Sequence, residues 1–209
     1  MSYTSGTTIA STATNGQYQF RAVDKAGNVS DTQTIYLDSA APTGTIKNSS
    51  GTAISGYTGG AFSYTATDTG SGVSYLQYKT PGSSSWTTYS SGTTISASAT
   101  NGLYQFRAVD NAGNTSAVSS IYLDTAIPTG KITDSNGTTV TTTTNKAFKY
   151  TASDGLSGIA YMQYKKPNST VWETYAAGTL IQTTDTNGIY RFRAFDNAGN
   201  CLLYTSDAA

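Results

Sequence analysis

Apolar and polar residues alternate along several short runs of the chain, and the clearest run lies at 103–109. Tyr104, Phe106 and Ala108 are separated there by polar residues. Successive side chains of a β-strand point to opposite faces of the sheet. The pattern therefore predicts a strand with one face in a core and the other in water.

Six further runs of strand-forming residues lie around this one, and clusters of Gly, Asn, Asp and Ser separate the runs. These runs are 44–48, 61–67, 73–79, 85–90, 93–97 and 117–123. Seven short strands separated by turn residues are typical of an immunoglobulin-like β-sandwich. The side chains expected in its core, besides those of the central strand, are Phe62, Tyr64, Val73, Leu76, Tyr78, Trp86, Ile95, Ile121 and Leu123.

The alternating run belongs to a long sequence repeat. ATNGQYQFRAVDKAGN at 13–28 returns as ATNGLYQFRAVDNAGN at 99–114 and as DTNGIYRFRAFDNAGN at 185–200, so that Gly16 corresponds to Gly102, 86 residues later. A period of about 86 residues is much longer than the small units that stack in a solenoid. It predicts tandem immunoglobulin-like domains, each with its own core.

The repeat divides the chain into four segments. Residues 1–41 are the C-terminal half of a truncated first unit, 42–127 form a complete second unit, and 128–200 form a third unit that lacks its last strand. Residues 201–209, CLLYTSDAA, leave the repeat and match the translated read-through of a sequencing adapter; a divergent natural C-terminus is the alternative. On the adapter interpretation the sequence is a fragment of a longer, metagenomic reading frame, and its single Cys does not report on the redox compartment.

The linker between the second and third units is short. Only Thr125, Ala126 and Ile127 lie between the last predicted strand, which ends at Asp124, and Pro128. Three residues followed by a proline do not behave as a flexible tether. We therefore expect the sandwiches to stand end to end as a rod.

The composition excludes several classes of function. The chain has 12 Lys and Arg against 12 Asp and Glu, and only 11% of its residues are charged. It therefore has no basic field for nucleic acid or for a membrane surface. The sequence contains no His, which removes the usual general base and a common metal ligand. No apolar run is long enough to span a membrane, and we expect no enzymatic activity.

The strings YxFRAxDxAGN and IYLDxxxPTG, together with SGV and a downstream Trp, cover the chain from Tyr3 to Asn200. They resemble the bacterial immunoglobulin-like tandem repeats of large surface adhesins and related extracellular proteins. The resemblance implies an extracellular or cell-surface stalk that holds distal functional domains away from the envelope. Its partners would be neighbouring repeats of the same chain, while other domains would contact host or cell-wall glycans and proteins.

Two other functions stay open beside the stalk. The repeats would be a glycan- or protein-binding module if aromatic side chains such as Trp86 and Trp172 were exposed for stacking. Their position beside predicted core strands favours buried packing instead. Alternatively, the repeats are accessory domains of a large extracellular hydrolase, and this segment would then look the same as a stalk.

Aspartates recur at three positions of the repeat, and an immunoglobulin-like topology brings these positions to the junctions between units. The candidate ligands are Asp38, Asp68, Asp110, Asn111 and Asn114 at the first junction, and Asp124, Asp154, Asp196, Asn197 and Asn200 at the second. Carboxylate and amide oxygens suit Ca²⁺, and the resemblance implies the same, since some repeats of this class stiffen their junctions with calcium. Asp and Asn beside Gly also form turns with nearby backbone, so both interpretations remain, and no cofactor is required for folding.

Overall fold

The computed structural model describes residues 3–205, and every regular element within that range is a β-strand. The strands are β1 (Gly16–Phe20), β2 (Gln33–Leu37), β3 (Thr43–Asn48), β4 (Gly56–Thr58), β5 (Phe62–Thr67), β6 (Val73–Lys79), β7 (Thr87–Tyr89), β8 (Gly102–Asp110), β9 (Ser119–Leu123), β10 (Thr129–Asp134), β11 (Phe148–Ser153), β12 (Ile159–Lys165), β13 (Glu173–Tyr175), β14 (Arg191–Asp196) and β15 (Cys201–Thr205). None of these residues forms a helix that is long and apolar enough to cross a membrane. The all-β fold expected from the sequence is confirmed.

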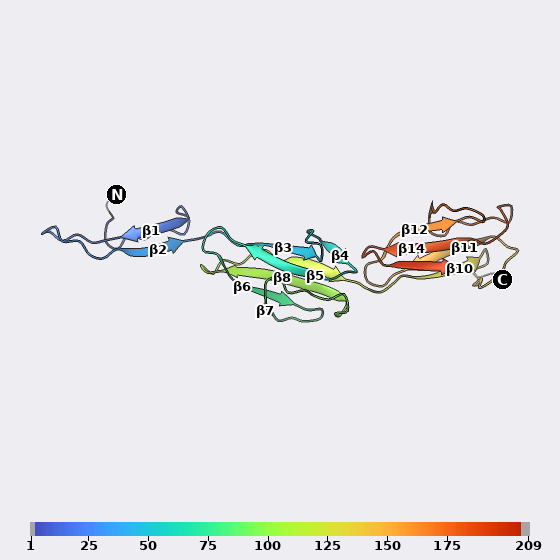
Figure 1. The fold of residues 1–209 in the computed structure, drawn as a ribbon, viewed down its shortest axis with the longest axis horizontal. Helices are drawn as coiled ribbons and strands as arrows, with labels where there is room; N and C mark the ends of the chain where they lie inside the picture. Colours follow the sequence, from blue (N-terminus) through green and yellow to red (C-terminus); the bar gives the residue numbers. More distant parts are fainter. Residues whose placement is uncertain (1–2, 206–209) are drawn as a thin grey trace.

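The three units follow one another along the longest axis of the molecule (Figure 1). The hairpin β1–β2 lies at one end, the second unit with β3 to β9 lies in the middle, and the third unit with β10 to β15 lies at the other end.

The second unit is a sandwich of two sheets. One sheet pairs β3 with β5, and the other has the order β4-β9-β8-β6-β7. The strand β8 lies in the middle of the larger sheet, and Tyr104, Phe106 and Ala108 on its inner face are all buried. The alternation in the sequence therefore sets which face of β8 forms the core.

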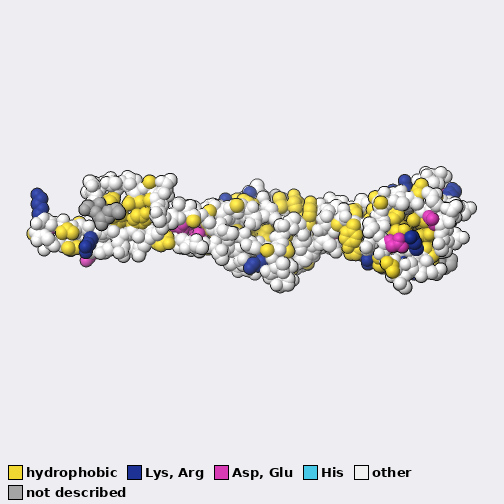
Figure 2. All heavy atoms as spheres, turned by 90° about the horizontal axis from the view of Figure 1, so that it is seen from above, with side chains coloured by type: hydrophobic (Ala, Val, Ile, Leu, Met, Phe, Trp, Pro, Cys, Tyr) yellow, Lys and Arg dark blue, Asp and Glu magenta, His cyan; other side chains and the backbone are white. Residues whose placement is uncertain are grey.

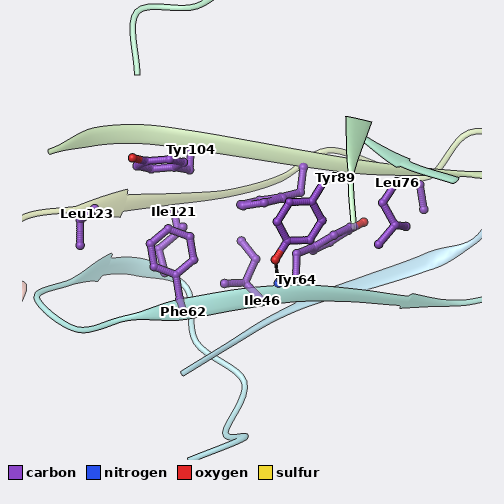
Figure 3. Packing of buried hydrophobic residues seen from close by; sticks show 10 residues of the cluster. Ile46, Phe62, Tyr64, Leu76, Tyr89, Tyr104, Ile121 and Leu123 are labelled. Carbon is purple, nitrogen blue, oxygen red and sulfur yellow. Dashed lines mark hydrogen bonds between the residues drawn. The ribbon is translucent and has the colours of Figure 1, made fainter. Parts of the chain in front are cut away.

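Aromatic rings fill the space between the two sheets (Figure 3). The Tyr64 ring stacks on Phe106 with 5.0 Å between ring centroids. The hydroxyl of Tyr89 accepts a hydrogen bond of 3.0 Å from the backbone N–H of Tyr64 and donates to the carbonyl of Thr93. This bond joins the end of β7 to the opposite sheet, so the core fixes how the two sheets face each other.

Two expectations about the second unit were wrong, and one strand was not expected. The run at 93–97 forms only an isolated bridge between Ile95 and Phe62. The short strand β4 was not expected, and it pairs in parallel with β9. Trp86 lies half-buried outside the core, whereas Tyr89 is buried. Trp86 and Tyr89 are three positions apart, and successive side chains of an extended chain point to opposite faces. When Tyr89 points into the core, Trp86 therefore points away from it.

In the third unit, residues beyond Asn200 add a strand to the sheet. The expectation that this unit lacks the last strand of the repeat stays a prediction, because β15 begins at the repeat position of Thr115 and not at that of β9. Residues 201–205 form β15, which pairs antiparallel with β14 from Arg191↔Thr205 to Phe195↔Cys201. Leu202 and Tyr204 are half-buried, and Tyr204 packs against the core, whereas Leu203 is exposed. Without β15, the edge of β14 would be unpaired, and such an edge pairs readily with another strand. The half-buried Leu202 and Tyr204 alternate with the exposed Leu203, so β15 can pair there with one apolar face toward the sandwich.

The first unit consists of the hairpin β1–β2 within the described residues. Its strands pair from Gly16↔Leu37 to Phe20↔Gln33, as β8 and β9 do in the second unit. Ile35 is 63% exposed, whereas its counterpart Ile121 is fully buried. The apolar side chains of this hairpin therefore lack the opposing sheet that covers their counterparts.

Candidate functional site

Three loops bring three carboxylates together where the first hairpin meets the second unit. Asp38 follows β2, Asp68 follows β5 and Asp110 ends β8. One carboxylate oxygen from each of the three lies within 4.8 Å of the other two. Acidic side chains are visible at this narrow waist in Figure 2, on a surface that otherwise carries few charges. The structure thus places the three sequence-predicted aspartates in one cluster.

Two hydrogen bonds cross the boundary at this first junction. The backbone N–H of Ser71 donates to Asp38 Oδ2 at 2.6 Å, and the amide Nδ2 of Asn114 donates to the Asp38 carbonyl at 3.0 Å. Asp38 belongs to the end of the hairpin, whereas Ser71 and Asn114 belong to two different loops of the second unit. The junction is therefore held by specific polar contacts.

The other two aspartates of the first junction also shape their own loops. Asp110 Oδ1 accepts hydrogen bonds from the backbone N–H groups of Ala112 and Asn114 at 2.9 and 2.8 Å. Asp68 Oδ2 accepts from Gly70 and Gly72 at 3.0 and 2.8 Å. Turn formation, one of the two interpretations of these aspartates, is thus present in the structure. Asp68 Oδ1 accepts no hydrogen bond from the residues that the structure describes.

The second junction repeats the first, 86 positions later. Asp124, Asp154 and Asp196 again bring one oxygen each within 4.8 Å. The N–H of Ser157 donates to Asp124 Oδ2 at 3.0 Å, and Asn200 Nδ2 donates to the Asp124 carbonyl at 2.8 Å. Asp124 is fully buried and Asp196 is 2% exposed. A geometry that recurs in two independent places follows from the repeat sequence and not from one accidental contact.

The linker between the second and third units is held against the second unit by hydrogen bonds. Asn101 Oδ1 accepts from the N–H of Thr125 at 3.2 Å, and Asp124 Oδ1 accepts from the N–H of Ala126 at 3.0 Å. Pro128, the first residue of the third unit, is fully buried. Of the three linker residues, only Ile127 is left with neither of these contacts, so the linker has little freedom to bend.

A further contact across the second junction was not expected from the sequence. The N–H of Gly59, directly after β4, donates to the carbonyl of Ala198 at 3.0 Å. A Cβ at position 59 would lie 2.8 Å from Asn200 Oδ1 and 3.3 Å from the Asp124 carbonyl. Only glycine allows the loop to approach this closely. The pair Gly59-Gly60 in an otherwise ordinary loop is the signal that could have identified it.

The asparagines expected as ligands act as donors to the loops. Asn111 Nδ2 donates to the carbonyls of Ser71 and Gly72 at 2.9 and 3.1 Å. Asn197 Nδ2 makes the corresponding bonds in the third unit, to Ser157 and Gly158. Their amide groups hold the two loops of each cluster together, so the aspartates are the residues best placed to hold an ion.

The junction carboxylates carry concentrated negative charge. Hydrogen bonds from Ser71 hold the pKa of the Asp38 carboxyl below its usual value. Burial by itself raises the pKa of Asp154, but the backbone hydrogen bonds from Leu156, Gly158 and Ser157 outweigh it and lower the pKa. The ion pairs among residues 3–205 are Lys146–Asp134 and Lys166–Glu173. No Lys or Arg in that range therefore pairs with a junction carboxylate.

A calcium ion fits this donor set. Calcium binds oxygen ligands at about 2.3–2.6 Å, so two ligands on opposite sides of one ion are roughly 4.6–5.2 Å apart. The oxygens of each cluster lie within 4.8 Å of one another. Buried like charges without a cationic partner are unfavourable, and a divalent cation would neutralise most of that charge. The aspartates of two consecutive units would then share one ion.

The two tryptophans were expected to be buried in the core, and they lie instead on the outer face of the sheets, beneath basic side chains. The Arg107 guanidinium lies 4.4 Å from the Trp86 ring centroid, and Lys79 Nζ lies 4.8 Å from it. Arg193 and Lys165 cover Trp172 in the same way, at 4.4 and 5.2 Å. Basic groups therefore occupy the ring surface that a sugar would use for stacking.

Comparison with known proteins gives a family match and similarities to solved structures. Residues 3–39 match the family model of the bacterial Ig-like domain. Among solved structures, the chain is similar to the fibronectin(III)-like modules of Clostridium thermocellum CbhA, with a TM-score of 0.35, 18% sequence identity, and coverage of 75% of this chain and 88% of that chain. No curated protein matches. The family match lies on the first copy of the repeat; the recurrence of its motif at 99–114 and 185–200 and the all-β fold support the same kind of domain in the rest of the chain.

Proposed function

We propose that this chain is a non-catalytic spacer segment of a secreted or cell-surface bacterial protein, and that its junctions are stiffened by calcium. The observation that supports it best is the second junction, where hydrogen bonds hold the linker and the two units directly. A spacer transmits position over a distance, so it needs defined angles between its domains. Hydrogen bonds that hold the linker to the second unit, together with those that join Asp124 to the third unit, give such angles.

Calcium would act on the junction and not on the fold of each unit. The two hydrophobic cores are built from other residues and are complete without the aspartates. Extracellular modules bind calcium with dissociation constants of about 10⁻⁴–10⁻³ M. Calcium at about 1 mM would then add roughly 0.4–1.4 kcal/mol for each site. That free energy is enough to favour one angle between two domains over others.

The glycan-binding alternative has less support. Arg and Lys side chains cover the ring faces of both tryptophans. A sugar would have to displace a guanidinium group before it could stack. The same pairing in two units, with Arg107 and Arg193 each bonded through Nε to a glutamine at 2.9 and 2.8 Å, favours a structural role for these residues.

The test is a thermal melt of the 209-residue chain, with small-angle scattering of the same samples, in millimolar CaCl₂ and in excess chelator. We expect calcium to raise the melting midpoint by a few degrees and to leave the scattering profile that of one extended shape. Mg²⁺ at the same concentration should act more weakly, because it requires shorter and more regular coordination.

Three variants make this test specific. Asp68→Asn and Asp154→Asn each remove a carboxylate from one cluster, and each should abolish the calcium effect at its junction. Asp24→Asn is the matched control, because Asp24 has the repeat position of Asp110 but lies outside both clusters. Superimposable melting curves with and without calcium would contradict calcium binding at the junctions. A scattering profile of freely jointed units, both in calcium and in chelator, would contradict the proposal that the chain is a spacer with defined angles between its domains.

A further inference from the structure

An Asn-Gly pair stands directly before the alternating run in every copy of the repeat. The pairs are Asn15-Gly16, Asn101-Gly102 and Asn187-Gly188. The fold requires glycine at the second position of the pair. Gly102 has a φ of +134°, in a region that favours glycine, and a Cβ there would lie 2.8 Å from Pro81 Cβ. A larger residue in place of the glycine would therefore strain the start of β8.

The asparagine of the pair holds the linker that follows its unit. Asn101 Oδ1 accepts hydrogen bonds from the backbone N–H of Thr125 at 3.2 Å and from the Thr125 hydroxyl at 3.1 Å. Asn15 Oδ1 accepts the same two bonds from Ser39, at 3.1 and 2.9 Å. Thr125 and Ser39 are each the first residue after the last strand's aspartate. Two separate structural needs thus place asparagine and glycine side by side at both junctions.

Asparagine deamidates readily before glycine, because glycine has no side chain to hinder its own N–H group. The backbone nitrogen of Gly102 attacks Asn101 Cγ, so that an N–Cγ bond forms and the Cγ–Nδ2 bond breaks. Ammonia leaves with the proton that the nitrogen of Gly102 gives up. One water molecule then opens the cyclic imide at either of its two carbonyls and leaves aspartate or isoaspartate. Asn101 is exposed, so water reaches it directly.

The linker supplies the groups that favour this attack. When the nitrogen adds to Cγ, negative charge develops on Oδ1 of Asn101, the atom that accepts both hydrogen bonds from Thr125. Hydrogen-bond donors aimed at an oxygen on which charge develops lower the barrier of acyl-transfer reactions. The N–H and hydroxyl groups that are held by the amide therefore also activate it.

We propose that Asn101-Gly102 and Asn15-Gly16 are self-modifying sites, at which the first residue of the linker promotes its own release. In the isoaspartate product the main chain runs through the former side chain, and the free carboxylate is attached directly to Cα. The acceptor oxygen at position 101 then no longer reaches Thr125, and the linker loses both hydrogen bonds to it. The junction becomes more flexible as the molecule ages, while the two cores, which contain none of these residues, stay folded.

The aspartate product has different effects at the two junctions. At the first junction Asn15 Nδ2 donates a long hydrogen bond of 3.5 Å to Asp38 Oδ1. Aspartate at position 15 replaces this donor with a carboxylate oxygen, and two like charges so close together repel each other. Aspartate at position 101 keeps an acceptor oxygen for Thr125. The first junction is therefore weakened by both products, and the second junction by isoaspartate.

The first experiment follows deamidation of the 209-residue chain, in chelator and at mildly alkaline pH, by peptide mapping that separates asparagine, aspartate and isoaspartate. We expect Thr125→Val to slow conversion at position 101 by roughly two- to tenfold, the factor that one ordinary hydrogen bond contributes. Asn136-Gly137, an exposed pair in the loop after β10, is the internal reference and should convert equally fast in both proteins. Equal or faster conversion of Asn101 in Thr125→Val, or an Asn101 that stays intact while Asn136 converts, would overturn the proposal.

The second experiment measures the effect of the modification on the junction. Spin labels at Ser84→Cys and Thr170→Cys, in a Cys201→Ser background, report the distance between the second and third units. In the aged protein we expect a broad component whose share follows the isoaspartate fraction at position 101. A fresh Asn101→Asp protein should keep the distribution of the fresh parent, and an aged Asn136→Gln protein should broaden as much as the aged parent. An aged protein rich in isoaspartate at position 101 but with an unchanged distribution would overturn the proposal.

Discussion

Tyr64 and Tyr150 occupy the same place in the two sandwiches and share one unusual feature. Each hydroxyl is buried without a hydrogen-bond partner among residues 3–205. Each also lies beneath a glycine: a Cβ on Gly44 would be 1.8 Å from the Tyr64 oxygen, and one on Gly130 would be 2.3 Å from the Tyr150 oxygen. These two glycines are needed because they leave room for a phenol. Burial raises the pKa of Tyr150 to about 12, so the buried phenol stays neutral at physiological pH.

Tyr64→Phe should leave the stability of the second unit unchanged or raise it by up to about 1 kcal/mol. A buried polar group without a partner costs roughly 1–3 kcal/mol, and Phe removes that cost while keeping the ring. Tyr89→Phe is the matched control, since the Tyr89 hydroxyl bonds to the backbone of Tyr64 and Thr93, and it should destabilise by about 1–3 kcal/mol. Urea unfolding of both variants measures the difference. A larger loss for Tyr64→Phe than for Tyr89→Phe would contradict this account.

At the scale of elements, the sequence predicts strands well where one face alternates over several residues. β8 was predicted at 103–109 and extends over Gly102–Asp110. β4 has only three residues, GYT, and it exists because β9 lies beside it in the fold. A pattern of three residues contains too little periodicity to indicate a strand. Pairings between segments far apart in the chain therefore could not be predicted from local patterns.

The loop that follows β4 should control the angle between the second and third units. Gly59→Ala places a Cβ against Asn200 and two backbone carbonyls and disturbs the bond to Ala198, whereas Gly60→Ala meets only Thr58 Oγ1 at 3.8 Å. Spin labels at Ser84→Cys and Thr170→Cys, in a Cys201→Ser background, report the distance between the units. We expect Gly59→Ala to broaden the distance distribution and Gly60→Ala to leave it unchanged. Both variants should melt at nearly the same temperature, because neither glycine belongs to a core.

At the scale of the whole molecule, the aspartates of the candidate site were predictable because they recur at equivalent positions of the repeat. Asp38 and Asp124 follow equivalent strands, and the topology of an immunoglobulin-like sandwich brings the other two loops to the same end. The backbone donors Ser71 and Ser157 were not predictable, since every residue carries an N–H group and only the folded loop aims it. The residues that carry charge at a junction are thus visible in the sequence, and the groups that hold them are visible only in the structure.

The shape of the molecule should depend on pH in the acid range. Asp38 and Asp154 have lowered pKa values in the folded chain, whereas an unfolded Asp titrates near about 3.9. A carboxyl whose pKa falls on folding stabilises the folded state above the unfolded pKa, and this contribution is lost as the pH falls through the folded pKa. The contacts of Asp38 with Ser71 and of Asp154 with its loop should therefore persist at pH 5–7 and weaken below about pH 4.

Small-angle scattering in chelator, from pH 7 to pH 3, measures this effect on the whole molecule. We expect one extended profile down to about pH 5 and a more flexible ensemble below about pH 4. Asp38→Asn keeps the size of the side chain but removes the charge that Ser71 stabilises, so the first junction of this variant should be loose already at pH 7. A wild-type profile that becomes more extended on acidification would mean that repulsion among the clustered carboxylates outweighs their hydrogen bonds. Protonation would then stabilise the junctions by removing the repulsion between the carboxylates, which is the opposite of the expected effect.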